Sequence, residues 1–156
     1  MTDPVGVRAA ADAPDLGTST RRRTVGRIAL GGFLMFAGIT HLTVGRQEFQ
    51  AQVPTWVPLD ADAVVLASGV VEITLGAALV AARARHRALV GGLTAAFFVA
   101  IFPGNVSQLV THTDAFGLDS DAARATRLVF QPLLVVWALW STGAWRTWRH
   151  RRREHS

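Results

Sequence analysis

The stretch GVVEITLG, residues 69–76, decides how the rest of the chain is interpreted. It lies inside an apolar run from about Ala61 to Ala82, which is long enough to cross a bilayer, since a spanning helix needs about 20 apolar residues. Glu72 falls near the middle of this run. A carboxylate at that depth costs about 2.5–3.5 kcal/mol on insertion scales. We therefore expect Glu72 to face the protein interior and to meet other polar groups there.

Composition indicates an integral membrane protein with a single domain. Half of the 156 residues are apolar, and they fall in four blocks separated by charged segments. The net charge of +5 comes largely from arginines that flank the apolar blocks, which favours a membrane location over nucleic-acid binding, the other class typical of a basic chain. The chain has no cysteine, which excludes disulfides, thiol catalysis and cysteine-ligated iron–sulfur or haem groups. A redox role through a bound quinone or a partner protein stays open.

The four blocks predict an all-α fold, an integral membrane bundle of four transmembrane helices. The expected spans are about 28–44, 61–82, 88–110 and 122–148. Residues 1–23 read as a disordered, basic N-terminal tail, 24–148 as the membrane domain and 149–156 as a basic C-terminal tail. A cleavable signal is the alternative for the first block, but no cleavage pattern follows it, so we expect a retained anchor. Small residues in that block should permit close helix contact; they are Gly31, Gly32, Ala37 and Gly38.

The connection from Gly45 to Asp60 differs from the other connections. Pro54 and Pro58 prevent a continuous helix. Trp56 stands between them, and tryptophan is favoured at the membrane–water interface. We expect an interfacial segment that includes Trp56 and Pro58; an ordinary surface loop is the alternative.

Positive charge predicts the orientation of the bundle. Basic segments occur before the first span, between the second and third spans at residues 83–87, and after the fourth span. These three segments fall on one side of a four-span protein, and the positive-inside rule makes that side cytoplasmic. Both termini are therefore expected in the cytoplasm.

Polar residues within the spans gather in the half of the bilayer away from the cytoplasm. Each of the four predicted helices contributes at least one; together they are His41, Glu72, Asn105, Arg127 and Gln131. The inner half is expected to contain only small or apolar residues. We expect Arg127 to pair with Glu72, because a guanidinium offsets the desolvation of a buried carboxylate. Two interpretations stay open: a ligand-binding polar pocket, or a purely structural set of contacts between helices.

Other chemistry finds little support in the sequence. His41 and His112 could ligate a metal, but no third ligand has suitable spacing, so no metal site is predicted. There is no nucleophile motif and no phosphate-binding loop of the known sequence types.

Five short motifs follow one another along the chain: FAGITHL (36–42), VPTWVP (53–58), SGVVEI (68–73), VAIFPGN (99–105) and RLVFQP (127–132). In this order they resemble the DoxX family of small bacterial membrane proteins with four helices, over about residues 28–148. Gly104 is a departure, since the family usually has alanine there.

The resemblance implies a multi-pass protein of the bacterial cytoplasmic membrane. The founding member of the DoxX family is a subunit of a thiosulfate:quinone oxidoreductase, and other members are linked to redox stress. We therefore expect a protein that binds a lipophilic small molecule, with a quinone as a candidate, within a redox or stress-related assembly. Its expected partners are the bilayer and either a redox protein or a second copy of the chain, without nucleic acid. A non-catalytic scaffold or assembly subunit and a small-solute transporter are the alternatives, and whether the protein is an enzyme stays open.

Overall fold

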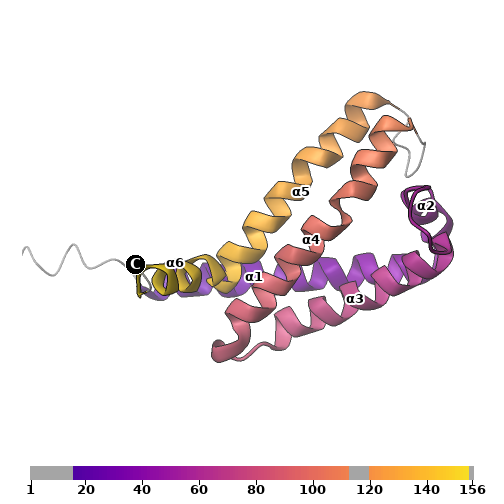
Figure 1. The fold of residues 1–156 in the computed structure, drawn as a ribbon. Helices are drawn as coiled ribbons and strands as arrows, with labels where there is room; N and C mark the ends of the chain where they lie inside the picture. The colour runs from indigo at the N-terminus through magenta and orange to yellow at the C-terminus, as the bar shows by residue number, and fades with distance from the viewer. Residues whose placement is uncertain (1–15, 113–119, 155–156) are drawn as a thin grey trace, which may run out of the picture.

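The computed structural model describes residues 16–112 and 120–154, and these ranges are helical apart from short connections (Figure 1). The elements are α1 (Leu16–Leu42), α2 (Arg46–Gln50), α3 (Ala61–Ala81), the 3₁₀ turn η2 (Ala84–His86), α4 (Arg87–Val110), α5 (Asp121–Thr142) and α6 (Ala144–Glu154). Within the described ranges, three stretches are long and apolar enough to cross a membrane: Thr20–Leu42, Ala61–Ala81 and Ala84–Val110. The all-α membrane class expected from the sequence is confirmed at this level.

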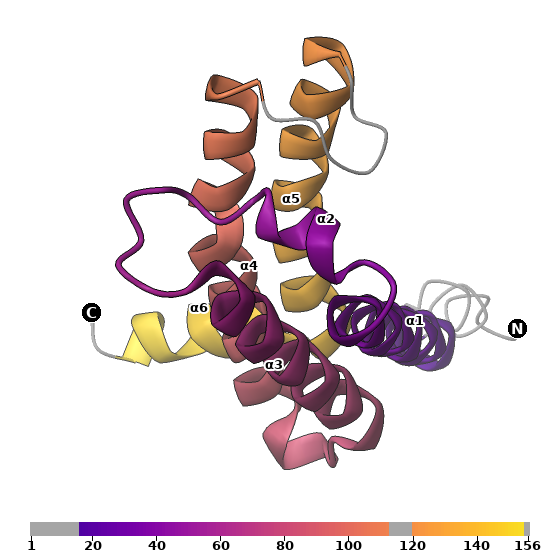
Figure 2. The ribbon, with the colours of Figure 1, turned by 90° about the vertical axis from the view of Figure 1, so that its right-hand side faces the viewer.

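The four long helices form two pairs rather than one parallel-sided bundle. Helix α1 packs mainly on α3, and α4 packs mainly on α5. The pairs meet near η2 and α6 and diverge toward the end where α2 lies (Figure 1). At the end where they meet, Trp137 Nε1 on α5 donates a hydrogen bond to the carbonyl of Gly26 on α1 at 3.0 Å. Figure 2 shows α2 and its connection at the open end, in front of the diverging pairs.

Glycines bring α1 and α3 into backbone contact. A Cβ atom added to Gly38 would lie 2.5 Å from the carbonyl oxygen of Gly69, and one added to Gly76 would lie 2.6 Å from that of Gly31. No real Cβ atom tolerates these distances, so only glycine fits. The predicted close contact is confirmed for Gly31 and Gly38. It is wrong for Gly32, which faces open space.

The helices bury little and present large apolar side chains outward. The core cluster consists of Leu30, Leu34, Leu79, Ala95, Phe98 and Ala138. Exposed large apolar residues occur on every long helix, for example Phe36 on α1, Val70 on α3 and Val99 on α4. An apolar exterior around a small core is what a lipid environment requires, because lipid chains cover the outer face.

The helix boundaries differ from the predicted ones at both ends of the membrane domain. Helix α1 begins at Leu16, so residues 16–23 are helical rather than a tail; residues 1–15 lie outside the described residues. The predicted fourth helix is interrupted at Gly143, whose φ of 75° is a left-handed conformation that suits glycine at a helix end. A separate helix, α6, then runs to Glu154, because arginine is a good helix former.

The connection between α1 and α3 is fixed to the start of α3. The Arg46 guanidinium pairs with the Asp62 carboxylate, and Gln50 Nε2 donates to the same carboxylate at 2.7 Å. The hydrogen bond to Asp62 raises the pKa of Arg46. Asp60 caps α3 by accepting from the Ala63 backbone N–H at 3.0 Å. These contacts hold α2 at the mouth of the gap between the helix pairs.

Candidate functional site

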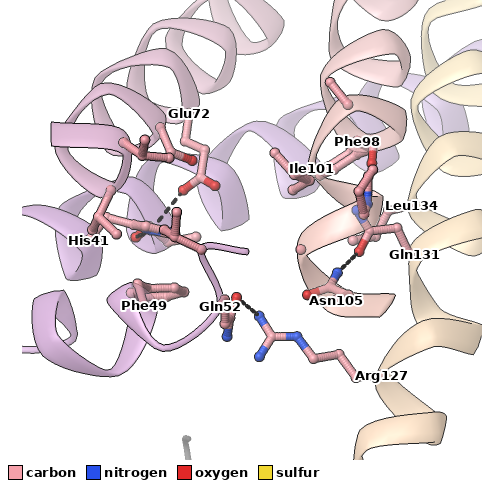
Figure 3. A pocket seen from close by; sticks show the side chains of 18 of the residues that line it. His41, Phe49, Gln52, Glu72, Phe98, Ile101, Asn105, Arg127, Gln131 and Leu134 are labelled. Atoms are coloured by element: carbon pink, nitrogen blue, oxygen red, sulfur yellow. Dashed lines mark hydrogen bonds and ion pairs between the residues drawn. The ribbon is translucent and has the colours of Figure 1, made fainter. Parts of the chain in front are cut away.

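A cavity of about 700 Å³ lies between the two helix pairs, with α2 and the connection after it along one side. It is lined by all five residues selected from the sequence: His41, Glu72, Asn105, Arg127 and Gln131. Figure 3 shows His41 and Glu72 on one wall and Asn105 and Gln131 on the opposite wall. The fold thus brings together polar residues from four helices, as their depths in the sequence indicated. That they bind a ligand stays a prediction.

His41 and Glu72 form the polar group on the α1–α3 wall. His41 Nδ1 lies 2.8 Å from the Ala37 carbonyl oxygen and 3.1 Å from Glu72 Oε2. A carbonyl oxygen can only accept, so the Nδ1 proton is directed to Ala37. Glu72 Oε2 is buried and has no hydrogen bond. The ring of Phe49 stacks on the His41 ring with centroids 3.4 Å apart, which fixes the imidazole in place.

Arg127 and Glu72 have different partners from those expected. His41 is the group at ion-pair distance from Glu72, while Arg127 Nη2 donates to Gln52 Oε1 at 3.0 Å (Figure 3). The reason is the divergence of the helix pairs, which places the cavity between the α3 carboxylate and the α5 guanidinium. In place of the predicted ion pair, Glu72 has His41 beside it, and Arg127 reaches across to Gln52 and feels the Glu72 charge without a close contact to it.

Asn105 and Gln131 link the two helices of the other wall. Asn105 Nδ2 donates to Gln131 Oε1, and Gln131 Nε2 donates to the carbonyl of Phe98 at 2.6 Å. Pro103 has no N–H for the carbonyl one turn earlier, Val99, so the helix is loosened beside this contact. Both hydrogen bonds join α4 to α5, which either interpretation of these residues allows. Both residues also line the cavity.

Apolar side chains make up most of the remaining wall. Phe33 and Leu34 come from α1, Phe98 and Ile101 from α4, and Leu134 from α5. Trp56 lines the cavity from the connection and is largely exposed, whereas Pro58 is not among the lining residues.

Gln52 was missed by the sequence analysis. It reaches Arg127 through Oε1, and its Nε2 atom is buried without a hydrogen bond. Nothing in its spacing marked it, because it lies in an irregular segment whose path the sequence pattern does not define. Among the described residues that line the cavity, two buried polar atoms therefore have no hydrogen bond, Gln52 Nε2 and Glu72 Oε2, and the second has only the His41 ring beside it.

No metal site accompanies this cavity. Among the described residues there is no group of three His, Asp or Glu side chains placed to hold a metal ion.

A family model described as "Domain of unknown function (DUF8561)" matches residues 30–142, which is most of the chain. The chain belongs to the DUF8561 family. The DUF8561 match runs from α1 to the end of α5 and includes every residue that lines the large cavity. No curated protein and no solved structure matches the chain.

Proposed function

We propose that this DUF8561 protein binds a lipophilic small molecule with polar ends, of the quinone class, in the cavity between its helix pairs. The observation that carries the proposal is that two buried polar atoms without a hydrogen bond, Glu72 Oε2 and Gln52 Nε2, accompany an apolar-walled space of about 700 Å³. Ligand sites of this size are typically apolar with a few polar groups that fix orientation. Buried polar atoms are rarely left unpaired, so a ligand that supplies the missing hydrogen bonds accounts for them.

The positions of the polar groups fit a flat ligand that is polar at both ends. Glu72 and His41 lie on one wall, and Asn105 and Gln131 lie on the other. A quinone carries a carbonyl oxygen at each side of its ring, and the aromatic and aliphatic side chains Phe98, Ile101 and Leu134 supply an apolar surface for the ring and tail. The DoxX resemblance, with its quinone-linked founding member, points to the same chemistry. We place the protein on this basis in a redox or stress-related assembly of a bacterial cytoplasmic membrane.

We also propose that α5 is a fourth transmembrane helix. Its outward face carries exposed Val129, Leu133 and Val136, while Arg127 and Gln131 line the cavity. The inward polar residues lower the average hydropathy of the helix without exposing charge to lipid. In the same arrangement, α2 and Trp56 lie at the outer headgroup level.

A non-catalytic scaffold is the alternative, and it would need the polar cluster to be fully packed. The cavity at Glu72 favours binding over that alternative. A transporter is less well supported, because the core residues Leu30, Leu79 and Ala138 pack together where the helix pairs meet.

Filling the cavity should abolish ligand retention. Ser68 lines the cavity, so in Ser68→Phe the ring should occupy ligand space while adding apolar contacts. Ala67→Phe is the matched control. Ala67 is the residue next to Ser68 and is exposed, so a phenylalanine ring there lies outside the cavity. We expect Ser68→Phe to lower binding of a short-tailed benzoquinone by about tenfold or more, which corresponds to about 1.4 kcal/mol. Tryptophan quenching titrations and quinone analysis of protein purified from native membranes provide the measurement. Equal binding by both variants, at equal thermal stability, would favour the scaffold.

Reporter proteins fused at Ser156 and within the α4–α5 connection should lie on opposite sides of the membrane. The expectation follows from four spans with basic segments in the cytoplasm. Alkaline phosphatase and fluorescent-protein fusions check it, with a fusion in the basic 83–87 turn as a cytoplasmic control. If Ser156 and the α4–α5 connection report the same side, α5 does not cross the membrane.

A further inference from the structure

A second, smaller cavity lies at the end where the helix pairs meet. Its volume is about 150 Å³. It is lined by Thr20, Arg23, Thr24, Arg27, Arg87, Ser141, Thr142 and Gly143. Three arginines converge here, and no acidic side chain is among the described residues that line the cavity. The three arginines fall just outside the predicted spans 28–44 and 88–110, so the sequence analysis did not select them as a polar site.

Two of the three guanidinium groups are held in place by backbone carbonyls. Arg27 is only 4% exposed and donates to the carbonyls of Leu79 and Val80, the latter at 3.0 Å. These are among the last carbonyls of α3, which have no partner within the helix. Arg87 Nε donates to the Ala82 carbonyl at 3.3 Å. Since a guanidinium has five N–H donors, both groups keep donors for a further partner.

The Arg23 guanidinium has a buried N–H donor that lacks an acceptor. Its Nε atom is buried and has no hydrogen bond. Its Nη1 atom lies 4.0 Å from where a Cβ atom on Gly143 would be, so Arg23 reaches the α5–α6 junction. The charges of Arg27 and Arg87 also repel each other. An anion in the cavity would satisfy Arg23 and offset this repulsion.

We propose that this cavity binds a phosphate group. The planar guanidinium group of arginine is positively charged, and its N–H donors match the spacing of two phosphate oxygens. The cavity volume of about 150 Å³ suits a phosphate group, and the rest of a larger molecule would lie outside the cavity.

The location favours the phosphate of a membrane lipid. Arg23 and Arg27 lie in the first turns of the apolar stretch Thr20–Leu42, and Arg87 lies at the start of Ala84–Val110, so the cavity is at the headgroup level. Helix α6 begins beside it and carries exposed Trp145 and Trp148, with Arg149 5.5 Å from the Trp145 ring. A helix with tryptophan and arginine in this combination is typical of a membrane surface. Anionic phospholipid is therefore the expected source, with free phosphate as the other.

The test measures lipid binding to the full-length protein by native mass spectrometry. Phosphatidylglycerol is compared with a galactolipid that has similar acyl chains and no phosphate. We expect the wild type to bind one phosphatidylglycerol in preference to the galactolipid. Arg23→Gln and Arg87→Gln should each weaken that binding by about tenfold, because each removes charge-assisted hydrogen bonds. Arg27 is avoided as a test position because it also satisfies α3 carbonyls.

Arg22→Gln is the matched control, since Arg22 is exposed and does not line the cavity. It should change binding by no more than about twofold, because exposed charges are screened by solvent and salt. Circular dichroism in galactolipid establishes that the variants are folded. Arg23→Lys keeps the positive charge but loses the paired N–H donors of the guanidinium, so it should bind with intermediate strength. If inorganic phosphate displaces the lipid and stabilises the protein alone, free phosphate is the ligand; if the lipid stays bound, the lipid phosphate is. Equal losses in Arg22→Gln and Arg23→Gln, or equal binding of the galactolipid, would overturn the proposal.

Discussion

Gly38→Leu should destabilise the protein by about 3 kcal/mol or more, at the upper end of the range for overpacked sites. The first added carbon would lie 2.5 Å from the Gly69 carbonyl oxygen and 3.0 Å from the Ile73 backbone nitrogen. These are backbone atoms of a helix, so they cannot rotate away as a side chain could. Helix α1 must instead move away from α3, and the contacts between His41 and Glu72 would be lost with it. The free energy of unfolding in mixed micelles provides the measurement.

Gly32→Leu is the matched control for this prediction. It introduces the same side chain six residues earlier on the same helix, where an added Cβ has nothing within 4 Å. The substitution should be neutral or slightly stabilising, because leucine is a better helix former than glycine by somewhat less than about 0.8–1 kcal/mol, the difference between alanine and glycine. Similar losses in the two variants would show that α1 and α3 do not meet through Gly38.

His41→Leu should cost about 3 kcal/mol, the upper end of the range for leaving a buried polar group without its partner. Glu72 is 4% exposed and would keep its carboxylate in the interior without the imidazole at 3.1 Å. The variant also loses the Phe49 stack that holds the α2 connection against α1. Thermal unfolding and free energies of unfolding, measured in the same detergent, test this expectation.

A double-mutant cycle separates the two candidate partners of Glu72. His41→Leu combined with Glu72→Leu should recover much of the loss, because the stranded carboxylate is gone. Arg127→Met combined with Glu72→Leu should show a smaller coupling energy than the His41 pair, because Arg127 feels the Glu72 charge but donates its hydrogen bond to Gln52. A larger coupling for Arg127 than for His41 would restore the pairing expected from the sequence.

Much of the fold could be predicted from the sequence, because the membrane imposes a simple length rule. The α3 helix was predicted within one residue at its end, and α4 within one residue at its start, since apolar runs bounded by charge define spanning helices. The end of α5 could not be predicted. The left-handed conformation of Gly143 follows from the junction with α6, and a single glycine in an apolar run is equally compatible with a continuous helix.

The members of the candidate site were predictable, but their contacts were not. Depth along a helix placed Glu72 and Gln131 near the midplane and Asn105 nearer the outer end, all in the same half of the bilayer, and all three line one cavity. Depth carries no information about the distance between helices. The divergence of the helix pairs therefore could not be foreseen, and with it the assignment of Arg127 to Gln52. The inner arginine cluster was missed because Arg23 and Arg87 were interpreted as signals of orientation only.

The separation into two helix pairs has a consequence for how ligand choice can evolve. Each wall of the large cavity is internally bonded, His41 to Glu72 in one arm and Asn105 to Gln131 in the other. The two arms are joined where they meet by the core cluster and by the Trp137–Gly26 hydrogen bond, so the cavity width depends on the packing at that end. Substitutions there can therefore change which molecules fit without altering any residue that touches them. Related chains with identical cavity residues need not share a ligand.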